Sequence, residues 1–322
     1  MKTKIIALLL SILMLGQTNA WAQTLNVNQS DYTQAVYSFT APQLTVGTAD
    51  VAGGTYATVS LPDATPSTHI GRPNLPLVSQ LIEIPLCEGV DVEVSDIQVR
   101  ALKPLEHPMM PVQPAPSKSD KKALPFVIDS AYYATDAFTD TPAAWVEKLG
   151  IGRDRCLAVL RISPISYNPS TGAMNMITSM SITLTYRGCD IAATQSMHSR
   201  YRSPDYALGN GTLNTLPDSK SIRDAAPLHY LIVAHSSFRG ALDSFVAWKK
   251  RQGFIVTVGY TDEEAVGTTS TSIANYTKSF YTNATDELPA PTYLLLVGDH
   301  QQIPAFAARC TSPDYNHVSD LY

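Results

Sequence analysis

The sequence predicts an exported protein with two parts: a β-rich region, forming an antiparallel sandwich or barrel, and then an α/β region with a largely parallel sheet. Up to about residue 195, short runs alternate polar and apolar residues between prolines and glycines, which is typical of half-buried antiparallel strands. After Pro227, apolar runs alternate with helical patterns, which indicates strand–helix–strand units. The amino terminus has the features of a secretory signal.

Residues 1–22 are predicted to be a signal peptide. Lys2 and Lys4 precede an apolar run over residues 5–15, and Ala20-Trp21-Ala22 supplies a small-x-small cleavage site before Gln23. The run is too short to span a bilayer, and no later stretch reaches the ~18 apolar residues that a membrane helix needs. A retained membrane anchor is the alternative. We therefore expect a secreted or cell-surface protein that begins near Gln23 and has no membrane span after signal removal.

Composition excludes several classes of function. Of the 322 residues, 44% are hydrophobic and 16% charged, as in folded rather than disordered chains. The formal net charge of −5 argues against a general nucleic-acid binder, which needs a basic face. The four cysteines include no CxxC pair, so we expect buried or unpaired thiols rather than a zinc site. Cys310 has no neighbouring base that would make it a nucleophile.

The β-rich region is expected to cover residues 23–195. Residues 90–99 and 180–186 alternate as strands, and Pro85 makes residues 81–86 an edge strand or the end of one. The sequence Asn-Pro-Ser-Thr-Gly at 168–172 predicts a tight turn that joins strands over 157–162 and 174–177. The proline-rich stretch 103–125 predicts a surface excursion rather than core.

A linker is expected over residues 196–227. Serines, glycines, asparagines and prolines predominate there, with little apolar periodicity. Its basic residues, Arg200, Arg202, Lys220 and Arg223, are candidate points of proteolytic processing, because exposed linkers are cleaved readily. A passive linker whose charges only solvate it is the alternative.

The α/β region is expected over residues 228–322. Strands are predicted at 229–234, 254–258 and 293–297, and helices at 238–251 and 270–281. Ser236 and Ser237 are candidate caps of the first helix, and Gly253 is expected to end it. Because residues 293–297 are apolar without alternation, we expect that strand to be buried on both faces and to lie at the centre of the sheet.

Asp299 and His300 follow this last strand, at the edge where open α/β sheets carry their chemistry. Asp299 is a candidate metal ligand, orienting group or turn cap, and His300 a candidate general base that lacks a visible nucleophile. Asp314, His317 and Asp320 are candidate partners of Asp299 around an ion, or residues of a solvated loop. No glycine-rich phosphate loop and no GxSxG elbow follows a strand.

Several motifs together resemble the gingipain family of cysteine peptidases. They are YLLLVGDHQQIP at 293–304 followed by Ser319-Asp320, FVAWKKRQG at 245–253, and YLIVA at 230–234. GRPNLP at 71–76 and RISPISYNP at 161–169 are similar to the propeptides of that family. The resemblance covers most of the chain after residue 22 and is stronger after Pro227.

The resemblance implies a secreted zymogen: signal peptide (1–22), β-rich prodomain (23–195), basic processing linker (196–227), and the amino-terminal part of a caspase-like α/β peptidase domain (228–322). It implies that the prodomain binds its own catalytic domain and that the enzyme acts on proteins or peptides. Family members carry a catalytic histidine in a GHG-type motif and a later cysteine, which we expect beyond Tyr322. Neither His300 nor Cys310 matches those positions, so this chain alone is expected to be inactive.

The resemblance also implies that Asp299 binds a structural Ca²⁺, with no organic cofactor. Two other functions stay open from sequence alone. One is a non-catalytic exported module whose β-rich region binds a partner, and the other is a surface peptidase of the same family that processes secreted proteins as a sortase does.

Overall fold

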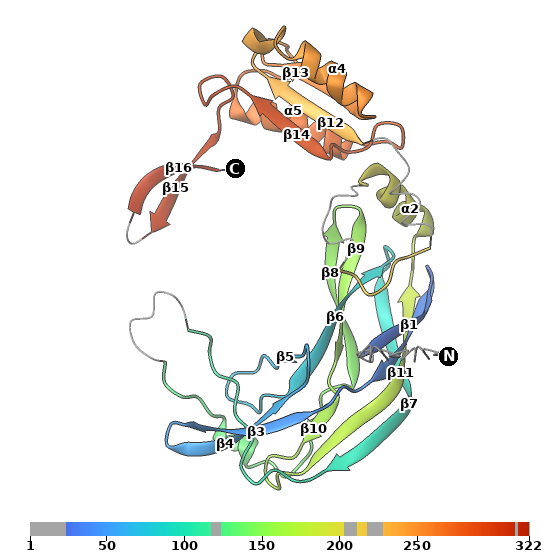
Figure 1. Cartoon of the computed structure of the whole chain (residues 1–322), viewed down its shortest axis with the longest axis vertical. Helices are drawn as coiled ribbons and strands as arrows, with labels where there is room; N and C mark the ends of the chain where they lie inside the picture. The colour runs from blue at the N-terminus through green and yellow to red at the C-terminus, as the bar shows by residue number, and fades with distance from the viewer. Residues whose placement is uncertain (1–23, 117–123, 203–210, 218–227, 313–314, 322) are drawn as a thin grey trace, which may run out of the picture.

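The β-rich region is a sandwich of two antiparallel sheets (Figure 1). The computed structural model describes residues 24–116, 124–202, 211–217, 228–312 and 315–321. The first sheet has the order β1-β2-β11-β10, and β7 also pairs with β11; the second has the order β5-β6-β9-β8. The strands are β1 (Leu25–Ser30), β2 (Gln34–Thr40), β3 (Thr45–Val51), β4 (Gly54–Ser60), β5 (Thr65–Pro66), β6 (Pro76–Ile84), β7 (Gly89–Leu102), β8 (Ala144–Gly152), β9 (Arg155–Ile162), β10 (Ile165–Tyr167) and β11 (Met174–Arg187).

One apolar core joins the two sheets. Tyr37 and Ile182 of the first sheet belong to the same buried cluster as Ile82 and Leu160 of the second, and all four are fully buried. Alternating residues of each strand supply these side chains, as in the burial pattern of β2, where every second residue is buried. The prediction of an antiparallel β-rich fold is confirmed, and the structure selects the sandwich. Strands β3 and β4 form a separate hairpin that extends from it (Figure 1).

The predicted turn at 168–172 is present, but it joins different strands from those expected. Gly172 N donates to Asn168 O at 2.9 Å, and the strands on either side are β10 and β11. Strand β9, the expected partner, lies in the other sheet. The chain changes sheets at Ser163-Pro164, between β9 and β10, because proline cannot donate to a ladder and ends the strand.

The proline-rich stretch is only partly a surface excursion. Residues 117–123, with the polar cluster at 118–122, lie outside the described residues. Met109, however, is fully buried in the sandwich core and forms a bridge with Ala57. The expectation of a surface segment is therefore wrong at Met109. An apolar side chain between prolines can fill a core gap even where the backbone forms no regular strand.

The expected linker is partly structured. Its first residues belong to α2 (Ile191–Arg200). Asp190 caps this helix, and its carboxylate accepts from Ala193 N at 2.8 Å. Further on, Leu213 N donates to Leu81 O, and the Asn214 side chain bonds both the N–H and the carbonyl of Glu83. Residues 213–214 thereby satisfy backbone groups of β6. The packing of the sandwich thus includes residues beyond 195, which composition alone did not reveal.

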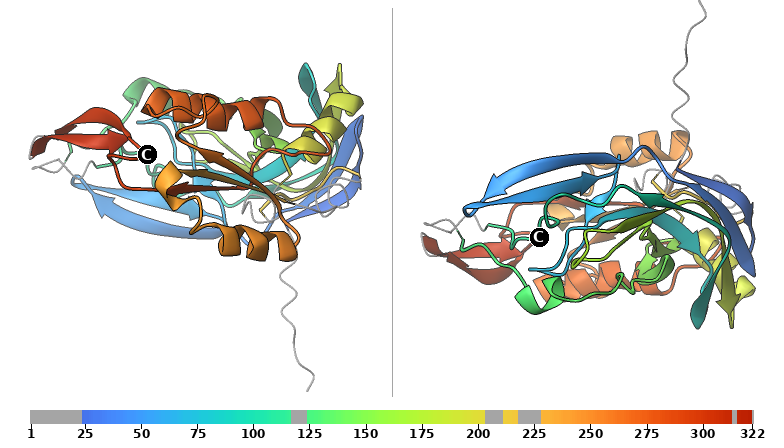
Figure 2. Two further views of the ribbon diagram at one scale, coloured as in Figure 1. Left: turned by 90° about the horizontal axis from the view of Figure 1, so that it is seen from above. Right: turned by 90° about the horizontal axis from the view of Figure 1, so that it is seen from below.

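The α/β region has a three-stranded parallel sheet in the order β13-β12-β14. Helices α4 and α5 lie on its opposite faces (Figure 2). Leu242 packs with Ile232 on the α4 face, and Ile273 packs with Val233 on the α5 face. The elements are β12 (His229–Ala234), η2 (Ser236–Phe238), α4 (Asp243–Arg251), β13 (Ile255–Tyr260), α5 (Ser270–Thr282) and β14 (Tyr293–Val297).

The expected strands and helices of this region are all present, and the largest change of boundary is at the start of the first helix. Ser236 and Ser237 start the short 3-10 helix η2 instead of capping α4, which begins only at Asp243. Gly253 follows the end of α4 with φ of 93°, a left-handed conformation that glycine adopts readily. The helix therefore ends where the sequence predicts.

Strand β14 is an edge strand of the described sheet, not its centre. Leu294 and Leu296 are 47% and 48% exposed, so the prediction of burial on both faces is wrong. Strand β12 has partners on both sides, and its last four residues are buried. An unbroken apolar run cannot distinguish a central strand from an edge strand. It indicates that the segment forms a strand, but not which neighbouring elements cover that strand.

A β-hairpin follows, formed by β15 (Phe306–Ser312) and β16 (Tyr315–Leu321). Cys310, His317 and Asp320 lie on its strands, but their side chains are outside what the structure describes, as is the whole of Asp314. Within the described part of the chain, no helix has the length and apolar character needed to cross a membrane.

Candidate functional site

The carboxyl edge of the parallel sheet is the first candidate site. Because β12, β13 and β14 run in the same direction, the residues that follow them meet at one edge. These are His235 after β12, Thr261 to Glu263 after β13, and Gly298 to His300 after β14. The structure thus confirms that Asp299 and His300 occupy the edge at which α/β sheets carry their chemistry.

Asp299 organises a tight turn. Its Oδ1 accepts from Gln301 N at 2.9 Å, and its carbonyl accepts from Gln302 N at 3.0 Å and Ile303 N at 2.8 Å. The preceding Gly298 has φ of 148°, and a Cβ there would lie 3.0 Å from Ile303 Cγ1. Glycine is therefore required for the turn to close on itself. Of the three roles open to Asp299, the turn role is visible in the geometry.

A calcium site is not assembled by the described residues. Calcium takes six to eight oxygen ligands, whereas no group of three His, Cys, Asp or Glu side chains comes together in the described part of the chain. Asp299 supplies one carboxylate, one oxygen of which already serves the turn. The role of Asp299 as a calcium ligand stays a prediction.

Two polar pairs at this edge were not anticipated from the sequence. His235 Nδ1 lies 2.8 Å from Ser237 Oγ and also accepts from Ser237 N at 3.3 Å, so the histidine caps η2. Arg239 stacks 3.8 Å above the Tyr260 ring and bonds Asp262 at 2.7 Å. The sequence feature that could have predicted the His235–Ser237 contact is a histidine directly after a strand and two residues before a serine. The His235–Ser237 contact and the Arg239–Asp262 ion pair are both exposed and join neighbouring loops, so each is explained by local structure.

An apolar hollow of about 810 Å³ lies beside this edge, between α5 and β14. Ile273 and Tyr281 of α5 line one side, and Leu294 and Leu296 of β14 line the other. Asp299 and His300 are among the residues that line it. The hollow lies over the part of the sheet that α5 leaves uncovered. Its wall includes the exposed leucines of β14, so it is not a separate site.

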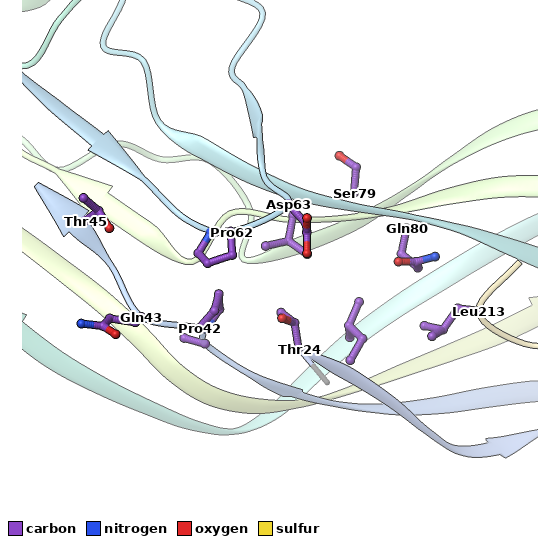
Figure 3. A pocket seen from close by; sticks show the side chains of 12 residues that line it. Thr24, Pro42, Gln43, Thr45, Pro62, Asp63, Ser79, Gln80 and Leu213 are labelled. Atoms are coloured by element: carbon purple, nitrogen blue, oxygen red, sulfur yellow. The ribbon is translucent and has the colours of Figure 1, made fainter. Parts of the chain in front are cut away.

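A second hollow, of about 820 Å³, lies in the sandwich (Figure 3). Thr24 immediately precedes β1, Pro42 and Gln43 follow β2, and Asp63 and Gln80 line the opposite wall. Asp63 is the only ionisable side chain among the lining residues. A lone carboxylate supplies neither a nucleophile nor an acid–base pair, so this hollow is not a candidate catalytic centre.

The second candidate functional surface is the contact between the two regions of the chain. Arg153, at the tip of the β8–β9 hairpin, donates from Nε to Tyr201 O at 2.9 Å and from an Nη atom to Pro291 O at 3.1 Å. Its φ is 61°, a conformation that costs a non-glycine residue about 1 kcal/mol or more. Arg153 thus joins the sandwich to the end of α2 and to the segment that leads into β14.

The end of α2 also contacts the α/β region directly. Ala290 N donates to Arg200 O at 2.7 Å, and the Tyr201 and Tyr281 rings lie 5.0 Å apart. Arg200 Nε lies 3.6 Å from Asp286 Oδ1. The segment over residues 200–201 is therefore held between the two regions.

The four basic residues of the expected processing linker fall in different environments. The Arg200 side chain is 47% exposed, whereas Arg202 is only 5% exposed and donates to Ser199 O at 2.9 Å. The expectation of an exposed residue is wrong for Arg202, because it folds back on α2. Lys220 and Arg223 lie outside the described residues.

Comparison with known proteins identifies the family. The family model Propeptide_C25 matches residues 17–198, and the model of peptidase family C25 matches residues 223–322. The chain belongs to the gingipain family, peptidase family C25. The prodomain and the start of the peptidase domain thus follow one another in this chain, and the resemblance drawn from the motifs is confirmed.

Among curated relatives, Lys-gingipain from Porphyromonas gingivalis is 33% identical over 89% of this chain, and Gingipain R1 from the same organism is 23% identical over 73%. The chain spans 17% of the length of Lys-gingipain. A solved structure that concerns the zymogenic latency of gingipain K from Porphyromonas gingivalis aligns with 52% of this chain and 95% of its own, at 29% identity and a TM-score of 0.48. A complex of RgpB pro- and mature domains aligns with 52% of this chain and 87% of its own, at 18% identity and a TM-score of 0.46.

Proposed function

We propose that this chain is the prodomain and first part of the peptidase domain of a secreted gingipain-like cysteine endopeptidase made as a zymogen. The observation that carries the proposal is the order of the two family matches, propeptide before peptidase, within one chain. The contacts of Arg153 and Arg200 with the α/β region support a prodomain that binds its own peptidase domain.

In the complete enzyme, a cysteine thiolate attacks the peptide carbonyl, a histidine moves the proton, and backbone donors stabilise the oxyanion. We propose that neither His300 nor Cys310 performs these steps, because neither occupies a catalytic motif of the family. His300 is exposed beyond the Asp299 turn, and no nucleophile contacts it among the described side chains.

Purified residues 23–322 are therefore expected to hydrolyse no peptide substrate in the presence of a thiol reductant. Peptides that end in lysine or arginine and carry a fluorogenic leaving group are the appropriate probes. Turnover that His300→Ala or Cys310→Ser abolishes would assign catalysis to this chain and contradict the proposal.

Processing is proposed to fall in the linker beyond Arg202. Arg200 is held by the contact of its carbonyl with Ala290, and Arg202 is buried, so cleavage at either requires local unfolding. Lys220 and Arg223, which lie outside the described residues, are the remaining basic candidates of the linker. Amino-terminal sequencing of the matured peptidase should give a start at or after residue 221, and Lys220→Ala with Arg223→Ala should block it. The matched control, Arg200→Ala with Arg202→Ala, should leave the start unchanged.

Export and calcium binding belong to the same proposal. A chain secreted through residues 1–22 should begin at Gln23, which sequencing of the exported precursor tests. For calcium, titration calorimetry of the complete protein should show a site that Asp299→Asn weakens and that His300→Ala, the neighbouring control, does not. Equal affinity in both variants would leave Asp299 with its turn role only.

A further inference from the structure

Two cysteines lie opposite each other where the pairing of β7 and β11 ends. The ladder between these strands runs to the pair Arg187 and Gly89. Beyond it the two chains stay together: Glu88 N donates to Arg187 O at 2.9 Å, and Asp190 N donates to Leu86 O at 2.8 Å. Continuing the register by one residue at a time pairs Gly188 with Glu88 and then Cys189 with Cys87.

The close approach at this end is independently visible at Gly188. A Cβ on this glycine would lie 2.6 Å from Glu88 Cδ, so the two segments are in contact one residue before the cysteines. The φ of Gly188 is 59°, which turns the chain here and explains why Glu88 N bonds Arg187 O rather than Gly188 O. The bond from Asp190 to Leu86 restores the register on the far side.

The position of the bond from Asp190 N to Leu86 O defines the type of pair. In an antiparallel ladder, hydrogen-bonded pairs alternate with non-hydrogen-bonded ones, whose Cα atoms are about 4.5 Å apart. Only one of the two bonds of a hydrogen-bonded pair joins Leu86 and Asp190, because Leu86 N donates instead to Thr194 Oγ1 at 3.0 Å. This single bond places Cys87 and Cys189 at a position of the second type. A disulfide requires Cα atoms roughly 4.4 to 6.8 Å apart, so this pair lies within reach.

The surroundings hold both cysteines in place. Each is a free thiol that is partly buried and packs against the sandwich core. Lys148 Nζ donates to the Cys87 carbonyl at 2.6 Å, and Asp190 caps α2 directly after Cys189. A bond between the cysteines would therefore fix the start of α2 to the segment that joins β6 and β7.

We propose that Cys87 and Cys189 form a disulfide when the chain enters an oxidising compartment. One thiolate attacks a sulfur of an oxidised dithiol protein or of glutathione disulfide and releases one donor thiol. The second cysteine then attacks the mixed disulfide and releases the other donor thiol. Two electrons and two protons pass from the cysteine pair to the donor.

Peptide mapping tests the proposal directly. The full chain with Cys310→Ser is oxidised with glutathione disulfide, blocked with iodoacetamide and digested with trypsin. Cleavage after Arg155, Arg161, Arg187 and Arg200 places Cys156 and Cys189 in different peptides. We expect a peptide that contains Cys87 joined to residues 188–200. A bond from Cys87 to Cys156, or three alkylated thiols, would overturn the proposal.

A stability measurement supplies the second test, with Cys156 as the matched control. Oxidation should raise the thermal midpoint of the sandwich by about 5 °C or more, because the bond closes a long loop. Cys87→Ser and Cys189→Ser should each abolish the difference between oxidised and reduced protein, whereas Cys156→Ser should retain it. Because each comparison is made within one variant, a destabilising substitution does not obscure the result. An oxidation-induced shift that persists in Cys87→Ser would contradict the proposed pair.

Discussion

The strands of the sandwich are buried more completely than the strands of the α/β region. In the sandwich, two sheets cover each other, and β9 presents residues such as Leu160 and Ile162 with no exposed surface. In the α/β region, α4 and α5 cover the central strand β12, while Leu294 and Leu296 of β14 stay about half exposed. The difference shows that an apolar strand is buried by its neighbours rather than by its own composition.

This comparison also locates where each region is sensitive to change. Truncating a buried side chain removes apolar contacts and leaves a cavity, whereas truncating an exposed one does neither. The predictions below place matched changes in the two regions. In the protein that begins at Gln23, Trp145 in β8 and Trp248 in α4 give separate fluorescence signals for the two regions, and Trp248→Phe isolates the sandwich signal.

The largest expected effect is in the sandwich core. Leu160→Ala should lower the free energy of unfolding by about 3 kcal/mol, because Leu160 is fully buried. The matched change Leu294→Ala should cost about 0.5 kcal/mol or less. Urea denaturation followed at Trp145 and Trp248 measures both. Equal losses would show that Leu294 is covered in solution and would remove the contrast between the regions.

A buried ionisable pair makes the sandwich sensitive in a second way. His198 Nε2 of α2 lies 2.9 Å from Glu83 Oε1 of β6, and both side chains have no exposed surface. The contact lacks the alignment of a hydrogen bond. Because removing one partner strands the other in the core, His198→Leu should cost about 3 kcal/mol.

The double variant His198→Leu with Glu83→Leu provides the control for this pair. It removes both polar groups at once, and we expect it to recover most of the loss in urea denaturation. A double variant that is less stable than His198→Leu alone would contradict this explanation. It would show that the attraction between the two side chains stabilises the fold by more than the cost of burying them.

The α/β region is expected to respond to pH through His229. Burial lowers the pKa of this histidine, whose ring nitrogens contact Pro289 O and Thr257 Oγ1 at 2.9 Å each. The folded state therefore binds its proton at lower pH than the unfolded state, which titrates near 6.5. The stability of the α/β region should be constant above about pH 6.5 and should fall below it, by at most ~1.4 kcal/mol per pH unit.

Denaturation at a series of pH values, followed at Trp248, measures this slope. His229→Gln retains hydrogen-bonding capacity without titrating in this range, so it should flatten the slope below about pH 6.5. His300→Gln, an exposed histidine in the same region, should leave the slope unchanged. A slope that survives in His229→Gln would assign it to another group.

The smallest expected effect is at the contact between the two regions. Arg153→Gly removes the bonds to Tyr201 O and Pro291 O and also relieves the φ of 61°. The sandwich should become more stable by up to about 1 kcal/mol, while its affinity for the separated peptidase domain should fall about tenfold. Calorimetry of unfolding and binding measures both changes. Arg153→Ala should weaken binding equally without stabilising the sandwich, which separates the contact from the strain.

The sequence by itself determined the order of elements, since the alternation of β7 and β11 and the unbroken run of β12 are local patterns that set the class of each strand. It also determined the family, through motifs at 230–253 and 293–304, and the place of Asp299 at a sheet edge, because the residues that directly follow a parallel strand lie at the carboxyl edge of its sheet.

Only the tertiary structure decided how those elements share their surfaces. It placed β9 and β10 in different sheets, buried Met109 and Arg202, and left Leu294 exposed, because burial depends on neighbours that are distant in the sequence. The same reason applies to Cys87 and Cys189, which are about a hundred residues apart in the chain and meet only because β7 and β11 are in register.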